Sequence, residues 1–128
     1  MKNDSEKKSK TTSVNRDKEV GDCIAQWADA FGLTDWNISY DFSGQDTTSN
    51  AEMHYKILPR SAHIMFSKDT VDYTPTIIHE LIHLLMADID DYVKDLIDTN
   101  IPPNQQDFIH NRYETLSEIL VHRLSQAF

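Results

Sequence analysis

Two histidines and a glutamate stand together in the run HELIH, where His79 and His83 are four residues apart and Glu80 directly follows His79. On a helix, residues four apart lie on one face, one turn from each other. Two imidazoles in that arrangement can bind the same tetrahedral zinc ion. Glu80 lies about 100° further around the helix axis, where its carboxylate can take a proton from a zinc-bound water. The run therefore predicts a zinc site with Glu80 as general base.

The neighbours of these three residues favour a metal over a chance arrangement. Residues 77–89 place apolar side chains all round the helix axis, which predicts a buried helix. Burying polar side chains without partners is costly, and a metal ion would satisfy all three of them at once. A solvent-facing helix would instead show a polar face around positions 79, 80 and 83. Thr76 is the only further polar residue near these positions.

A catalytic zinc site normally has a third protein ligand. The pattern H-E-x-x-H-x-x-G-x-x-H of the metzincins is absent, because Met86 and Ile89 stand where its Gly and last His would be. The acids that directly follow the helix are better placed to solvate its end than to bind the metal. Two glutamates in YETLSEIL lie one turn apart among apolar residues. The candidate third ligands are thus Asp88, Asp90, Asp91, Glu114 and Glu118.

HELIH followed 31 residues later by ETLSE resembles the gluzincin metallopeptidases. Thermolysin-like members of that group carry their glutamate ligand in an E-x-x-S-D helix. Carried over by position, the resemblance implies that Glu114 is the third zinc ligand and that Glu118 hydrogen-bonds His79. This chain has Glu rather than Asp at position 118, and the extra methylene lets the two roles be exchanged. Glu118 is therefore the alternative third ligand.

Residues 36–127 also resemble small zincin-like proteins of bacteriophage and prophage genomes. The resemblance implies a minimal zincin-like domain, in which a small, mostly antiparallel sheet packs on an active-site helix and a C-terminal glutamate-bearing helix. It further implies that a substrate peptide lies extended along the edge strand of the sheet, above the metal. Residues 51–57 and residues 61–67 are both candidates for that edge strand.

The elements that must position the site follow from hydrophobic periodicity. Apolar residues at helical spacing predict a helix from Val20 that stops at Gly32. Alternating residues predict three strands arranged as a meander, the last two forming an antiparallel hairpin. Thr74 and Pro75 can begin the buried helix as N-cap and first helical residue. The expected strands are 36–42, 51–57 and 61–67, and the later helices are 77–89, 90–98 and 105–127, which is an α+β domain.

Length, charge and cysteine content restrict the classes of protein. The 128 residues suffice for one domain, predicted at 18–128 after a disordered basic arm at 1–17. Residues 1–18 carry six Lys and Arg against three Asp and Glu, whereas residues 19–128 carry six against eighteen. This acidic balance argues against nucleic-acid binding. No apolar run predicts a membrane span or a secretory signal. Cys23 is the sole cysteine, which fits a reducing, cytoplasmic setting.

These features together predict a zinc metallopeptidase that cleaves protein or peptide substrates, as an endopeptidase rather than an exopeptidase. Tyr73, Tyr113 and His122 are further candidates for stabilising the oxyanion that forms during cleavage. The alternative function is a catalytically silent zincin-fold module that binds and sequesters a protein partner. Glu80 argues against that alternative, because a purely structural zinc site has no use for a base. The sequence does not specify the substrate or the oligomeric state.

Overall fold

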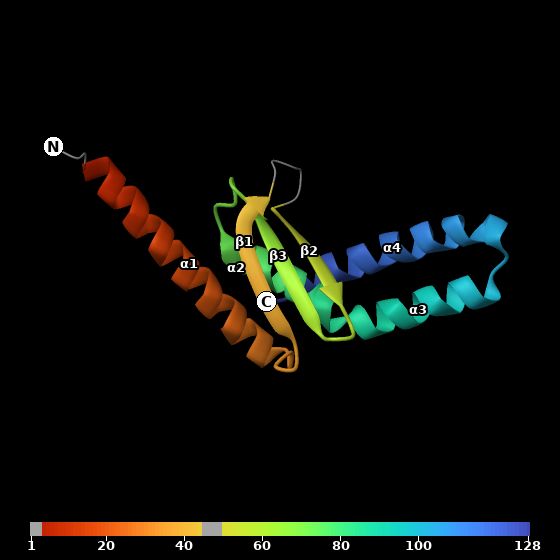
Figure 1. Ribbon diagram of the computed structural model, residues 1–128. Coiled ribbons are helices and arrows are strands. Elements are labelled where there is room, and N and C mark those ends of the chain that lie inside the picture. The colour runs from red at the N-terminus through yellow and green to blue at the C-terminus, as the bar shows by residue number, and fades with distance from the viewer. Residues whose placement is uncertain (1–3, 45–49) are drawn as a thin grey trace.

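The computed structural model describes residues 4–44 and 50–128, with side chains from Asn15 onward (Figure 1). The described chain forms an α+β fold, as predicted, with a small sheet and helices before and after it. Its elements are α1 (Asp4–Ala30), β1 (Asn37–Gly44), β2 (Ala51–Lys56), β3 (Ser61–Ser67), α2 (Tyr73–Leu85), α3 (Ala87–Asn100) and α4 (Pro103–Gln126). None of the described helices combines the length and the hydropathy that crossing a membrane requires.

The sheet has the strand order β1-β3-β2, so β3 is the central strand. The antiparallel hairpin of β2 and β3 is confirmed, with His54 opposite His63. The predicted meander is wrong, because β1 pairs with β3 in parallel. The sheet is therefore mixed rather than mostly antiparallel. Alternation along a strand indicates which side chains face the core, but it carries no information on which strand is the neighbour.

One end of the β1–β3 pair depends on a glycine. The register between the two strands shifts between Asp41 and Gly44. A Cβ atom at Gly44 would lie 2.7 Å from the carbonyl oxygen of Phe66. Only glycine permits the backbones to approach this closely, so Gly44 lets β1 remain against β3 beyond the irregularity.

One core joins α1, the inner face of the sheet and α2. The inward alternation predicted for the strands is confirmed by Ile64 and Phe66, which have no exposed surface. The burial predicted for the HELIH helix is confirmed for most of its apolar residues, although Leu85 is half exposed. The largest fully buried side chains are Phe66, Ile64, Ile77, Leu81, Ile82, Leu84, Val20 and Val121.

The first helix is longer than predicted, because α1 begins at Asp4. Residues 4–17, for which the composition predicts disorder, instead continue the helix, and residues 1–3 of the predicted arm lie outside the described residues. Glycine and proline are absent before Gly21, so no residue breaks the helix on its N-terminal side. A segment that is poor in apolar residues can still adopt a helical backbone. The predicted stop is confirmed, since Gly32 follows the helix with a φ of 72°.

The later helices differ from the predicted ranges at their ends. Asp72, not Thr74, is the N-cap of α2, and the buried helix ends at Leu85, so that α3 starts at Ala87. The antiparallel hairpin of α3 and α4 extends away from the sheet, on the side opposite to α1 (Figure 1). The C-terminal half of α4 returns to α2, and this return is the feature that builds the site described next.

Candidate metal centre

Helix α2 presents His79 and His83 on one face, as their spacing predicted. The centroids of the two imidazole rings are 5.0 Å apart. Both side chains are about three-quarters buried, with 26% and 23% of their surface exposed. The two histidines are thus held side by side where a ligand can still reach them.

Helix α4 brings a carboxylate to both histidines. Oε1 of Glu118 lies 3.0 Å from Nε2 of His79, and Oε2 of Glu118 lies 3.1 Å from Nε2 of His83. Ligand atoms of the three side chains all lie within 4.8 Å of one another. Atoms that share a tetrahedral zinc ion at about 2.0 Å are separated by about 3.3 Å. The separation of Glu118 from each histidine is therefore close to that of two atoms sharing a zinc ion, and the three side chains together could hold a metal.

The packing between α2 and α4 explains why Glu118 reaches this position. Val121 is fully buried and packs with Ile78 and Ile82 of α2. Each of these isoleucines directly precedes one of the histidines, and Val121 follows Glu118 by three residues, on the same face of α4. The apolar contact therefore sets Glu118 level with the histidine pair.

Glu114 lies one turn earlier on α4, is exposed, and is not part of this group of ligand atoms. The geometry favours Glu118, the alternative from the sequence, over Glu114 as third ligand. Two of the acids that follow α2 have other partners. Asp88 accepts a hydrogen bond from Arg60 at 3.0 Å, and Asp90 accepts one from the hydroxyl of Tyr113 at 2.6 Å.

The electrostatic setting keeps His79 suited to binding a metal. Burial, and then the neighbouring His83, lower the pKa of His79, although the nearby Glu118 opposes this shift. A lowered pKa favours the neutral imidazole, whose free lone pair is what a metal ion requires.

Glu80 lies beside the histidines in a half-buried position. Burial, followed by repulsion from Glu118 and Glu52, raises the pKa of Glu80 to about 7. A cation held by the histidines would oppose this shift, since it favours the charged carboxylate. In the absence of a cation, the Glu80 carboxyl group with its pKa of about 7 can exchange a proton near neutral pH.

A groove of about 420 Å³ runs between β2 and α2, which we call the β2–α2 groove. Residues 51–54 of β2 line one side, and His79, Glu80, His83 and Glu118 line the rest. Of the two strands considered as the edge beside the metal, β3 is excluded because it is central. Strand β2 is therefore the edge strand over the candidate metal centre.

Of the three side chains that the sequence offers for stabilising the oxyanion, His122 lies close to the candidate metal centre. It follows Glu118 by one turn on α4, and it lines a second hollow, of about 570 Å³, together with His79 and Glu80. The other two oxyanion candidates lie elsewhere. Tyr73 packs against Phe42 and Phe66 in the core, and Tyr113 is bonded to Asp90.

The chain matches no protein-family model, no curated protein and no solved structure. The assignment of a function therefore depends on the chemistry of the residues themselves.

Proposed function

We propose that this chain is a zinc-dependent peptidase with a zincin-like fold, and that His79, His83 and Glu118 hold the metal. The single observation that carries the proposal is the convergence of one carboxylate on both imidazoles, 3.0 and 3.1 Å away. Glu80 stands next to this group on the same helix. Two histidines, a glutamate ligand and a second, free glutamate are the set that metal-assisted peptide hydrolysis uses.

Zinc bound by these residues would polarise the substrate carbonyl and lower the pKa of a bound water. Glu80 takes the proton of the attacking water and then passes it to the leaving amine. Its raised pKa without metal reflects how little solvent it meets. His122 lines the hollow of about 570 Å³ together with His79 and Glu80. Its side chain is available to donate a hydrogen bond to the oxyanion.

The edge strand supports a peptide as the substrate. Within the described residues β2 pairs only with β3, which leaves the backbone groups on its other side for an added strand. An extended peptide can pair there, next to Glu80 and the histidines. Such pairing uses the backbone of an internal segment and needs no chain terminus, which favours an endopeptidase. A cytoplasmic location is part of the same proposal, since Cys23 is the sole cysteine.

The test of the proposed function is cleavage of an unfolded protein by the purified chain. We expect fragments in the presence of zinc, loss of activity with a chelator, and recovery when zinc is added back in slight excess. Magnesium should not restore activity, because it prefers oxygen ligands in octahedral geometry. Cleavage that continues at full rate after the metal has been removed would contradict the proposal.

A further inference from the structure

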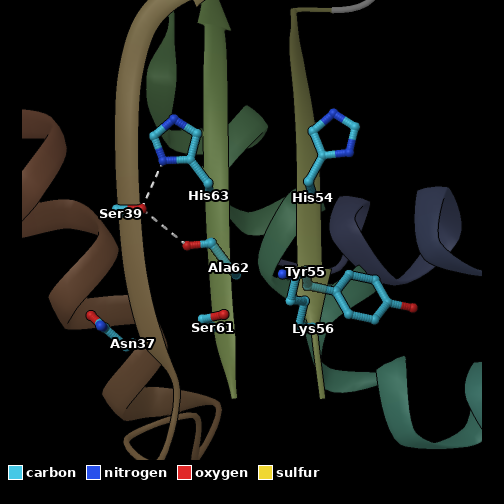
Figure 2. A pocket seen from close by; sticks show the side chains of 8 residues that line it. All are labelled: Asn37, Ser39, His54, Tyr55, Lys56, Ser61, Ala62 and His63. Carbon is cyan, nitrogen blue, oxygen red and sulfur yellow. Dashed lines mark hydrogen bonds between the residues drawn. The ribbon is translucent and has the colours of Figure 1, made fainter. Parts of the chain in front are cut away.

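The outer face of the sheet carries a second group of potentially reactive side chains, which lie outside the HELIH segment. The strands place Ser39 of β1 beside His63 of β3, and His63 beside His54 of β2, in one row across the sheet. Asn37, Ser61 and Lys56 form the next row, about 7 Å further along the strands. Figure 2 shows both rows on the same face, around a cavity of about 310 Å³.

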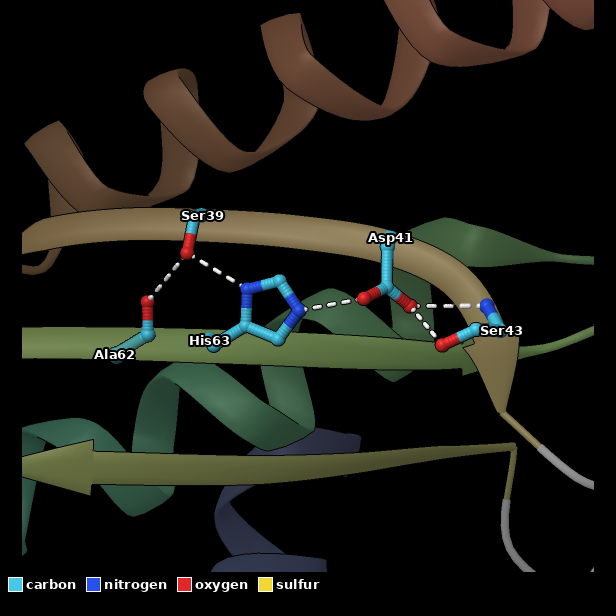
Figure 3. Close-up of polar contacts among 5 residues, drawn as sticks. All are labelled: Ser39, Asp41, Ser43, Ala62 and His63. Atoms are coloured by element: carbon cyan, nitrogen blue, oxygen red, sulfur yellow. Dashed lines mark hydrogen bonds and ion pairs between the residues drawn. The ribbon is translucent and has the colours of Figure 1, made fainter.

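A continuous chain of hydrogen bonds runs through this face (Figure 3). The hydroxyl oxygen of Ser39 lies 2.7 Å from Nδ1 of His63, and Nε2 of His63 lies 2.7 Å from Oδ2 of Asp41. The other oxygen of Asp41 accepts hydrogen bonds from Ser43, at 2.9 Å from the backbone nitrogen and 2.6 Å from the hydroxyl. Each group is thus oriented by the next one.

The direction of the hydrogen bonds follows from the charge of Asp41. Its two bonds from Ser43, and then its bond with His63, lower the pKa of Asp41 to about 2, so it is an ionised carboxylate at neutral pH. A carboxylate only accepts, so Nε2 of His63 carries a proton. In the neutral imidazole Nδ1 then has a free lone pair, which accepts the hydroxyl proton of Ser39.

The serine hydroxyl has a second acceptor, but a weaker one. The carbonyl oxygen of Ala62 lies 3.3 Å from the Ser39 hydroxyl, compared with 2.7 Å for Nδ1 of His63. The shorter contact is the stronger one. Ser39 is also exposed, so a molecule in the cavity can reach its oxygen. These are the conditions under which a neighbouring base activates a serine.

We propose that Ser39, His63 and Asp41 form a metal-independent nucleophilic site that accepts small carboxylic esters. The Ser39 oxygen bonds to the acyl carbon while its proton moves to Nδ1 of His63. The bond from acyl carbon to alkoxy oxygen then breaks, and His63 returns the proton to the departing alcohol. Water, as the second reactant, releases the acid and restores Ser39, with His63 again taking and returning a proton.

Asp41 holds the imidazole in the required tautomer and stabilises its protonated form. Asn37 and Lys56 line the same cavity, and their side chains carry hydrogen-bond donors of the kind that stabilise an oxyanion. The cavity of about 310 Å³ leaves room for a small ester beside Ser39. The three acting residues are separate from His79, His83 and Glu118, so the site is independent of the proposed peptidase.

The experiment that tests this proposal uses a fluorophosphonate probe with the full chain in the presence of a chelator. Attack by Ser39 forms an oxygen–phosphorus bond and releases fluoride, and intact-mass measurement followed by peptide mapping locates the adduct. We expect one adduct, on Ser39, and none in Ser39→Ala. His63→Ala should slow labelling by about 100-fold or more, the usual contribution of a positioned base.

Ser61→Ala is the matched control, because Ser61 lines the same cavity but is not part of the hydrogen-bond chain. It should label at the rate of the unchanged protein. Circular dichroism verifies that each variant is folded. We expect folding to be preserved, because these side chains lie on the outer face of the sheet. The proposal is overturned if the folded, unchanged protein forms no adduct, if the adduct is on another residue, or if His63→Ala labels at an unchanged rate.

Discussion

Glu118→Ala is expected to weaken zinc binding by more than about 100-fold, since even partners that merely orient a ligand contribute about 10–100-fold. Glu118 reaches both histidines at 3.0 and 3.1 Å, and its removal leaves two imidazoles to hold the ion. The fold should persist, because the Glu118 side chain is 57% exposed and the buried contact of α4 is made by Val121. Competition with a chromogenic zinc chelator measures the change in affinity.

Glu114→Ala is the matched control for that experiment. It removes the same side chain one turn earlier on the same helix, from an exposed position outside the group of ligand atoms. We expect its zinc affinity to equal that of the unchanged protein. The opposite pattern, with loss of zinc in Glu114→Ala and retention in Glu118→Ala, would restore the roles that the resemblance to gluzincins implies.

Glu80→Gln is expected to reduce peptide cleavage by about 100-fold or more while zinc remains bound. The substitution keeps the shape of the side chain but removes its ability to take a proton, and a positioned general base contributes about 10²–10⁴-fold. Glu80 is outside the group of ligand atoms formed by His79, His83 and Glu118. Zinc content and the cleavage rate of an unfolded protein, measured on the same preparation, separate binding from catalysis.

The same variant distinguishes the enzyme from the alternative of a silent binding module. Glutamine at position 80 also removes a carboxylate that burial and two acidic neighbours destabilise. We therefore expect the variant to fold with equal or higher stability. If the unchanged protein and Glu80→Gln bind zinc equally and neither cleaves any substrate, a binding function is favoured instead.

The part of the candidate site that lies within one helix could be predicted from the sequence. His79, Glu80 and His83 are neighbours because of helical periodicity, which is a local property. The burial of Ile77, Leu81 and other apolar residues of α2 was likewise expected from their distribution around the axis. The helical periodicity of the sequence was therefore sufficient to predict the grouping of the residues that α2 contributes.

The proposed third ligand could not be chosen from the sequence, because Glu114 and Glu118 differ by one turn and share a similar apolar setting. The choice depends on where Val121 meets Ile78 and Ile82, which is a long-range contact. The parallel pairing of β1 with β3 is a long-range property as well. Periodicity indicates the face of an element but not its partner.

The hydrogen-bond chain on the outer face of the sheet also depends on long-range strand pairing. Ser39 and His63 are 24 residues apart in the sequence and meet only because β1 and β3 run in parallel. The expected meander would have placed β1 beside β2 instead. Only the observed strand order brings the serine, the histidine and Asp41 together.

The measurement that tests the central claim most directly is the zinc content of the unchanged chain, purified without chelator and analysed by native mass spectrometry. We expect one zinc ion per chain in the folded protein, and none after His79→Ala or His83→Ala. A folded chain that carries no zinc, and that gains none when zinc is added at micromolar concentration, would contradict the metal centre and the peptidase that depends on it.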